Sequence, residues 1–232
     1  DMIHHTSTIS YYAGPDAAIN DGYFIPLNDY MDKYAPNYKA LLESDSVYYK
    51  AATTDSGKIW SFILTYDKDK YPWVGTMYRK DVFEKCGLEQ PVTISDWEHA
   101  FDVLQSNGWD NPLAMTESGF GAVGFMAAFD AWNDFFQIDG KVYYGPITEG
   151  YKDFLICMRQ WYEKGYIHQD TQNDLIPPDL EPDLANNKYC VIASGGDAAA
   201  GASILATGVA TDPDFYMIAA PYTKLTEGQK TH

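Results

Sequence analysis

The amino-acid sequence predicts an α/β fold, and three observations carry that prediction. Short runs of apolar, β-branched and aromatic residues alternate along the chain with amphipathic segments of helical period. One pair of runs is joined by a hairpin turn, which adds an antiparallel element. Hydrophobic residues make up 46% of the 232 residues, so the chain is long and apolar enough to bury a sizeable core.

The first part of the chain reads as a short strand followed by helices. The strand opens into a polar, aromatic loop over Thr6–Asp16, and Ala17–Gly22 predicts a helical turn ended by its glycine. Asn28 is a good N-cap residue for a helix over Asp29–Tyr34. We expect one further helix over Tyr38–Tyr49.

Two extended apolar runs follow, Lys58–Thr65 and Trp73–Tyr78, with a polar, aromatic loop between them. A short helix over Arg79–Lys85 comes directly after the second run and stops at Gly87. Four aromatic residues lie in or beside the loop, namely Trp60, Tyr66, Tyr71 and Trp73. An aromatic loop between two strands indicates a place where a cleft between two lobes can form.

The middle of the chain carries a capping-box pattern. Ser95, with Glu98 three residues later, predicts the start of an amphipathic helix that ends near Asn107. Trp97 falls on the apolar face of this helix, so we assign its ring to the core.

A strand, a helix and a hairpin are expected next. Pro112–Met115 predicts a short buried strand, and Gly119–Trp132 predicts a helix of small residues. The pair Asp139 and Gly140 is typical of a type I′ hairpin turn. The pattern G-x-G-x-x-G occurs at 119–124, but no strand precedes it, so dinucleotide binding is not expected.

The last part of the chain returns to alternating helices and strands. A helix over Thr148–Lys164, ended by Gly165, is followed by a strand over Lys188–Ser194, a helix over Ala198–Ala206 and a strand over Phe215–Pro221. The apolar face of the first of these helices is expected to hold Phe154, Leu155, Met158, Trp161 and Tyr162.

Charge and cysteine content exclude several classes of function. The net charge of −17 would repel phosphate backbones and anionic lipids, so nucleic acids and membrane surfaces are not expected partners. No apolar run approaches the roughly 18 residues that span a bilayer. Cys86, Cys157 and Cys190 are read as small hydrophobic residues, without a disulfide or a zinc site. The adjacent His4 and His5 would point to opposite faces of a strand, so a shared metal is not expected. No cofactor is expected either.

The sequence favours recognition without reaction. It contains no H-E-x-x-H, G-x-S-x-G or Walker pattern. Sugars are bound by aromatic faces, with carboxylates and amides on their hydroxyls. The side chains that supply this chemistry are Tyr12, Asp16, Trp60, Trp73, Trp132, Asp134 and Asp197. Two alternatives stay open, a secreted carbohydrate-active enzyme with an aromatic cleft and a lone interaction domain.

Four stretches, in order and at their spacing, carry a family resemblance: Asp21–Tyr30, Asp55–Phe62, Met77–Leu88 and Pro91–Glu98. They resemble bacterial extracellular solute-binding proteins of ABC importers, family 1, carbohydrate type, including its lipoprotein members. The resemblance implies a type II periplasmic-binding-protein-like fold with two lobes joined by hinge strands. The implied division is a partial first lobe with the crossover at 1–78, a second lobe at 79–206 and a return toward the first lobe at 207–232.

The resemblance also extends the set of candidate ligand residues. It adds the loop from Ser7 to Asp16, the loop before Gly75, Phe120 and its neighbours, and Gly195–Asp197. The complete set of expected ligand-binding residues is Ser7, Tyr12, Asp16, Trp60, Tyr66, Trp73, Phe120, Trp132, Asp134, Gly196 and Asp197.

The implied function is an extracellular receptor that binds a small solute, with a mono- or oligosaccharide favoured over a peptide or polyamine, and delivers it to an ABC permease. Members are anchored to the cell surface by a lipid in Gram-positive bacteria or lie in the periplasm. From the family pattern we expect the signal, the lipid-attachment cysteine and the first β-α units to be missing from the start of this sequence, and the closing helices to be missing after His232. We therefore expect an incomplete first lobe.

Overall fold

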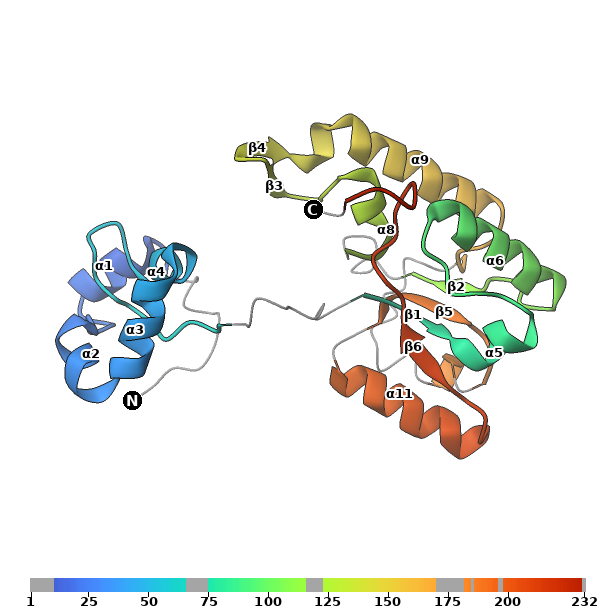
Figure 1. Cartoon of the computed structure of the whole chain (residues 1–232), viewed down its shortest axis with the longest axis horizontal. Coiled ribbons are helices and arrows are strands. Elements are labelled where there is room, and N and C mark those ends of the chain that lie inside the picture. The colour runs from blue at the N-terminus through green and yellow to red at the C-terminus, as the bar shows by residue number, and fades with distance from the viewer. Residues whose placement is uncertain are drawn as a thin grey trace. The chain divides into compact units, whose positions relative to one another are not determined.

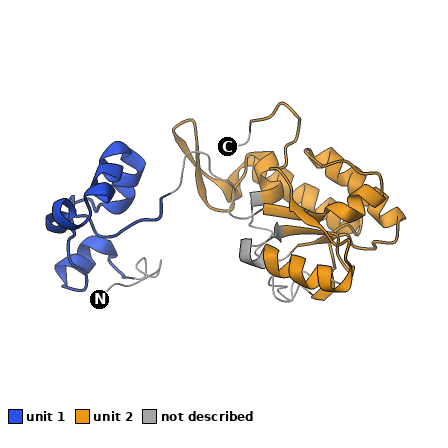
Figure 2. Ribbon diagram, turned by 60° about the horizontal axis from the view of Figure 1, so that its bottom comes forward, with its two compact units in different colours: residues 1–71 blue, residues 72–232 orange. Residues whose placement is uncertain are grey.

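The structure is a computed structural model that describes residues 11–65, 75–115, 123–169, 182–184, 186–195 and 198–230. The chain divides into two compact units, Asp1–Tyr71 and Pro72–His232 (Figure 2). The division into lobes at 78/79 and 206/207 stays a prediction.

The described part of unit 1 consists of short helices around a small core (Figure 1). The helices are α1 (Gly14–Asn20), α2 (Asn28–Tyr34), α3 (Pro36–Ser44) and α4 (Ser46–Ala52). This core is a cluster of buried apolar side chains formed by Met31, Leu42, Ala52 and Ile59. Helices this short are not stable alone in water, so their packing on this core holds them.

The prediction of a single helix over Tyr38–Tyr49 is wrong, because the helical conformation is interrupted at Asp45. The backbone of Asp45 is extended, with φ −141° and ψ 117°, and its carboxylate accepts a hydrogen bond from the Val47 amide at 2.8 Å. Asp45 is therefore the N-cap of a new helix, α4.

Asn28 does not cap α2, contrary to expectation. Its side-chain amide donates to the carbonyl of Gly57 at 3.1 Å and its Oδ1 accepts from the Ile59 amide at 2.9 Å. Leu27 occupies the N-cap position and offers no capping side chain. The Asn28 side chain instead fastens the start of α2 to the segment that follows α4.

The strand expected over Lys58–Thr65 is also wrong. The described residues of this run form one isolated bridge, between Thr53 and Ile59, and join no sheet. The Tyr38 hydroxyl donates to the Ser61 carbonyl at 3.1 Å and accepts from the Ile63 amide at 3.0 Å. A side chain from α3 thus takes backbone hydrogen bonds that a neighbouring strand would otherwise make.

Unit 2 is built on a four-stranded sheet of order β2-β5-β1-β6. Its strands are β1 (Gly75–Arg79), β2 (Leu113–Ala114), β5 (Val191–Gly195) and β6 (Met217–Ala219). β2 and β5 are parallel, whereas β1 is antiparallel to both β5 and β6. These positions confirm the strands expected near 112–115, 188–194 and 215–221 and the C-terminal part of the run expected over 73–78.

Helices cover both faces of this sheet, which makes unit 2 a three-layer α/β structure (Figure 1). Val191 and Ala193 point into the larger core with the helices α6 and α9, while Ile192 points into a smaller core with α11. This alternation follows from the two-residue period of a strand. The helices of unit 2 are α5 (Lys80–Lys85), α6 (Ile94–Ser106), α8 (Val123–Met126), α9 (Glu149–Glu163) and α11 (Ala198–Thr211).

The N-terminus of α6 differs from the expected capping box of Ser95 and Glu98. The box is formed by Thr93 and Asp96, whose side chains bond each other's backbone amides at 3.1 and 2.8 Å. Thr93 forms an isolated parallel bridge with Lys224, and the Ile94 amide donates to the Lys224 carbonyl at 2.9 Å. This pairing keeps Thr93 extended, so the helix starts directly after it.

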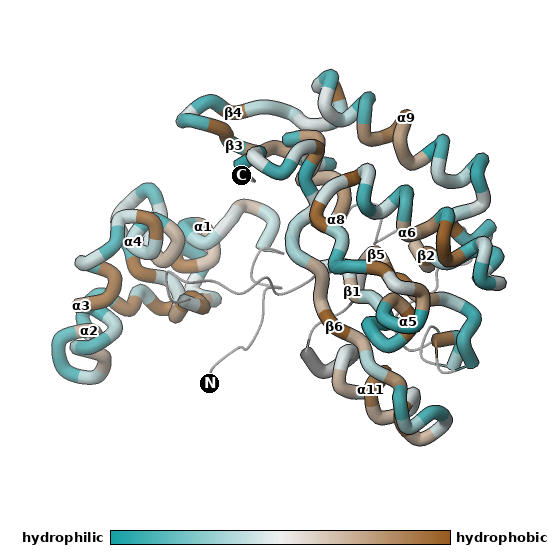
Figure 3. The backbone as a smooth tube through the Cα atoms, turned by 45° about the vertical axis from the view of Figure 1, so that its right-hand side comes forward, coloured by the Kyte–Doolittle hydropathy of each residue, from teal (hydrophilic) through white to brown (hydrophobic). Residues whose placement is uncertain are grey.

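The buried face of α9 agrees with the expectation in part, and Figure 3 shows brown and teal alternating along this helix. Phe154, Met158 and Trp161 are buried, as is Trp97 of α6, which confirms the core assignment of both tryptophans. Leu155 and Tyr162 are each 41% exposed, contrary to expectation. Cys157 takes a buried position on this face instead.

The predicted hairpin is confirmed. β3 (Phe135–Ile138) pairs with β4 (Lys141–Tyr144), and the turn residues Asp139 and Gly140 have φ values of 49° and 80°. Both values are positive, as a type I′ turn requires. The 3₁₀ turns η2 (Ala127–Phe129) and η3 (Gly145–Ile147) flank the hairpin. The helix expected over Gly119–Trp132 is shorter, because it gives way to η2 after Met126, and residues 116–122 lie outside the described ranges.

The three cysteines are free, with Cys157 and Cys190 buried and Cys86 partly so. Burial raises the pKa of the Cys157 thiol to about 12 and raises the pKa of Cys190 as well. These two thiols therefore stay protonated and act as hydrophobic side chains, as predicted. None of the helices in the described ranges is long and apolar enough to cross a membrane.

Candidate functional site

The expected ligand residues fall into two groups. Six lie outside the described residues: Ser7, Tyr66, Trp73, Phe120, Gly196 and Asp197. Five are described, with Tyr12, Asp16 and Trp60 in unit 1 and Trp132 and Asp134 in unit 2. Each unit is therefore considered by itself, and a ligand role for all eleven residues stays a prediction.

In unit 1, Asp16 belongs to a polar network on the first turn of α1. Its carboxylate accepts hydrogen bonds from the Ser56 hydroxyl at 2.5 Å and the Ser56 amide at 3.3 Å. Lys58 lies 3.9 Å from the carboxylate and donates to Asn20 at 2.7 Å. The Ser56 hydroxyl is the main cause that lowers the pKa of Asp16. Asp16 is thus held ionised and already bonded, with about a third of its side chain exposed.

The two aromatic candidates of unit 1 differ in exposure. Tyr12 is fully exposed, while Trp60 is half-buried and its amide donates to the Ala52 carbonyl at 3.1 Å. Because Ala52 is the last residue of α4, this hydrogen bond ties the backbone of Trp60 to that helix.

In unit 2, three strand ends point to one edge of the sheet. Gly75, at the start of β1, pairs with Gly195, at the end of β5. β2 is parallel to β5 and runs toward the same edge, where Met115 follows it. Three candidates lie within two residues of these ends in the sequence, namely Trp73, Gly196 and Asp197, and Phe120 follows β2 by six residues. Since open α/β sheets bind ligands outside the carboxyl ends of their strands, this edge is the candidate site in unit 2.

Close packing behind this edge involves a glycine that sequence reasoning missed. A Cβ atom on Gly124 of α8 would lie 2.2 Å from the Thr76 hydroxyl and 3.3 Å from the Ala193 carbonyl. The start of α8 therefore rests directly on β1 and β5. The signal in the sequence was the glycine of the 119–124 pattern, whose role here is helix–strand packing.

The remaining candidates, Trp132 and Asp134, lie in an irregular segment between η2 and β3. Trp132 is half-buried and Asp134 is exposed. Asp134 accepts a hydrogen bond from the Phe135 amide through its side chain at 2.8 Å and one from the Gly145 amide through its carbonyl at 3.0 Å. The segment thus presents an aromatic ring and a carboxylate close together in the chain, which suits sugar recognition.

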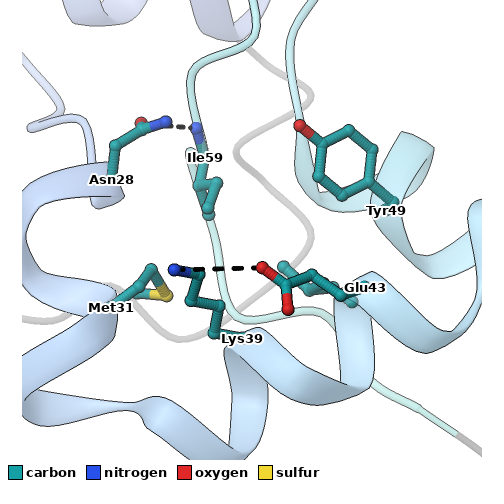
Figure 4. Close-up of a pocket in the computed structure, with 7 residues that line it drawn as sticks. Asn28, Met31, Lys39, Glu43, Tyr49 and Ile59 are labelled. Atoms are coloured by element: carbon teal, nitrogen blue, oxygen red, sulfur yellow. Dashed lines mark hydrogen bonds and ion pairs between the residues drawn. The ribbon is translucent and has the colours of Figure 1, made fainter.

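A pocket of about 230 Å³ in unit 1 does not fit a saccharide. It lies between α2, α3 and α4 (Figure 4), and its volume falls below the roughly 300–1,000 Å³ of usual ligand sites. Its polar groups face one another, because Asn28 bonds Ile59 and Lys39 lies 3.8 Å from Glu43. Within the described residues, no three His, Cys, Asp or Glu side chains gather as a metal site.

Comparison with known proteins was made with both sequence and structure. No protein-family model matches the chain. The fructooligosaccharide ABC transporter substrate-binding protein FusA of Streptococcus pneumoniae serotype 4 is 30% identical over 188 residues, which cover 67% of this chain and 35% of FusA. This match confirms the predicted resemblance to solute-binding proteins of ABC importers.

Solved structures show the fold. An HMO-binding, ABC-transporter-associated solute-binding protein from Bifidobacterium longum infantis matches 90% of this chain and 45% of its own, with a TM-score of 0.68 and 17% identity. FusA in complex with kestose matches 76% of this chain and 40% of its own, with a TM-score of 0.55 and 24% identity. The chain has the type II periplasmic-binding-protein-like α/β fold, and it spans less than half the length of these proteins.

Proposed function

We propose that this protein is the solute receptor of an ABC importer and that it binds an oligosaccharide and delivers it to the permease. The observation that carries this proposal is the 30% identity with FusA, which extends over 188 residues. The fold of unit 2 supports it, because the start of β1 and the carboxyl ends of β2 and β5 share one edge of the sheet, where α/β receptors hold ligands.

The proposed mechanism is closure around the ligand. A saccharide that contacts both lobes stabilises the closed form by its differential affinity for that form, and a hinge motion brings the lobes together. Tyr12 and Trp60 would contribute from the first lobe, and Trp132 and Asp134 from the second. The protein would act outside the cytoplasmic membrane, in the periplasm or anchored by a lipid, and would release its ligand unchanged.

A thermal-shift screen of the whole protein tests this function. We expect kestose or a related oligosaccharide to raise the melting temperature, since a ligand at 100 times its dissociation constant adds about 2.7 kcal/mol to the free energy of unfolding. Monosaccharides, peptides and polyamines complete the screen. Stabilisation by a peptide or polyamine with no response to any saccharide would refute the carbohydrate assignment.

Analysis of the saccharide in the same samples distinguishes a receptor from an enzyme. A receptor leaves kestose intact after prolonged incubation, as chromatography of the saccharide would show. Release of smaller sugars that disappears in an Asp134→Asn variant would instead favour a carbohydrate-active enzyme.

A further inference from the structure

The segment Phe129–Asp134, which carries Trp132, is held against another stretch of backbone by a glycine. A Cβ atom on the buried Gly145 would lie 1.6 Å from the Trp132 carbonyl oxygen and 3.2 Å from that of Asp134. The Gly145 amide also donates to the Asp134 carbonyl at 3.0 Å. No residue with a side chain fits at this position unless the backbone of Trp132 moves.

A second glycine holds the other end of the segment. Gly150, in the first turn of α9, lies where a Cβ atom would be 2.2 Å from the Phe129 carbonyl oxygen. Asp130, the next residue, has a left-handed backbone with φ 47°. A non-glycine residue keeps that conformation when its surroundings impose it.

Side chains fix the same segment from two further directions. The Gln229 amide donates to the Ala128 carbonyl at 2.9 Å, and the Phe129 ring packs on Phe154 of α9 with the ring centroids 5.9 Å apart. The backbone that leads to Trp132 is therefore held by α9, by η3 and by the C-terminal part of unit 2. In Figure 1 the hairpin β3–β4 leads through η3 into α9, so one chain segment both follows Trp132 and returns to support it.

We propose that Gly145 is a positioning residue that sets the orientation of Trp132 toward a bound saccharide. Recognition groups must be held within about 0.5 Å of their productive place, and a rigid backbone beneath an aromatic ring lowers the entropy that binding would otherwise cost. Gly145 touches no ligand in this scheme, because it acts through the backbone of Trp132. The expected effect of Gly145 on saccharide binding rests on the proposed function, whereas its expected effect on Trp132 in the ligand-free protein does not.

The test compares Gly145→Ala with Gly201→Ala in the whole protein. A Cβ atom on Gly201 would meet Met77 at an ordinary 3.5 Å, so this variant makes the same chemical change in the same unit without a clash. The tryptophans are labelled with 5-fluorotryptophan, and loss of one fluorine resonance in Trp132→Phe assigns Trp132. We expect G145A to shift or broaden this resonance in the absence of any ligand, and to weaken kestose binding at least tenfold. G201A should change neither.

Three results would overturn the proposal. One is a folded G145A whose Trp132 resonance is that of the wild type. Another is kestose affinity that falls in Trp132→Ala but stays intact in G145A, which removes this role of Gly145 and leaves the proposed function standing. The third is normal kestose binding by W132A, which removes Trp132 from the site and with it the role of Gly145 in binding.

If G145A does not fold, Gln229→Ala takes its place, since it removes the hydrogen bond to the Ala128 carbonyl without adding an atom. We expect Q229A to fold and to shift or broaden the Trp132 resonance. A sharp, unshifted resonance in Q229A would contradict the view that the segment is held by its surroundings.

Discussion

Arg79 and Asp81 form a buried ion pair whose hydrogen bonds reach several parts of unit 2. The Arg79 side chain is 1% exposed and makes two parallel bonds to Asp81, at 2.8 and 2.6 Å. It also donates to Asn187 at 2.8 Å, and its guanidinium carbon lies 3.9 Å from the centroid of the Phe215 ring. The Tyr216 amide completes the site by donating to Asp81 at 3.3 Å. One pair thus links the end of β1 to α5, to the turn before β5 and to the approach to β6.

Removing one member of this pair is expected to be costly. Asp81→Ala removes both short bonds to the buried Arg79 charge and leaves it the Asp212 carboxylate, 3.8 Å away, so we expect a loss of up to about 3–5 kcal/mol in the free energy of unfolding. Urea denaturation followed by circular dichroism measures it. Glu163→Ala, which breaks the exposed pair with Arg159, is the control and should cost less than about 1 kcal/mol. Equal losses in the two variants would contradict the structural role of the buried pair.

The same carboxylate makes stability depend on pH. Burial opposes its ionisation, but the hydrogen bonds and charge of Arg79 outweigh burial and hold the pKa of Asp81 below its usual value. A lowered pKa stabilises the folded state at pH values above the unfolded-state pKa of about 4, and this contribution disappears as the pH falls through the folded-state pKa.

We therefore expect the free energy of unfolding to fall more steeply with acidification in the wild type than in Asp81→Asn. Urea titrations between pH 6 and pH 3 would measure both slopes. Because other carboxylates titrate equally in the two proteins, the difference between the slopes isolates Asp81. Identical slopes would show that Asp81 titrates normally in the folded state.

Helix α6 shows how two overlapping capping signals are resolved. Thr93 with Asp96 and Ser95 with Glu98 both fit the pattern, and they lie two residues apart. The backbone of Lys224 pairs with Thr93 and Ile94 and thereby holds Thr93 in the extended conformation that an N-cap needs. A contact across more than a hundred residues therefore selects the start of a helix.

Two substitutions distinguish these caps. Thr93→Ala removes the capping hydroxyl and should lower the free energy of unfolding by about 1 kcal/mol. Ser95→Ala alters an exposed helical position and should be neutral or slightly stabilising, because alanine has the higher helix propensity. Thermal or urea unfolding of both variants gives the comparison. A larger loss of unfolding free energy in S95A than in T93A would show that Ser95 and Glu98 form the capping box instead.

The complete protein is expected to become more compact when it binds a saccharide. Closure of two lobes over a ligand shortens the molecule, so kestose at saturating concentration should lower the radius of gyration in small-angle X-ray scattering. A variant that does not bind, such as Trp132→Ala if it proves so, should scatter identically with and without kestose. An unchanged radius with a bound ligand would rule out the closing mechanism and leave the binding function in place.

The sequence was informative wherever structure depends on neighbours in the chain. The hairpin at Asp139 and Gly140, the buried Trp97 and Trp161, and the strands of unit 2 follow from local turn chemistry and hydrophobic period. It also predicted the family resemblance, because the ordered motifs at 21–30, 55–62, 77–88 and 91–98 survive in the chain irrespective of how it packs.

Tertiary structure decided the features that depend on residues far apart. Asn28 donates a hydrogen bond to Gly57 instead of capping α2, and the Tyr38 hydroxyl bonds the backbone near Ser61. Gly145 has no side chain, which lets its backbone pack against that of Trp132. A pattern of residue types records what a side chain can bond, whereas the fold determines which partner lies within reach. The sequence by itself therefore determined the class of fold, most of its elements and the resemblance. The caps, the run at 58–65 that joins no sheet and the support of Trp132 required the packed chain.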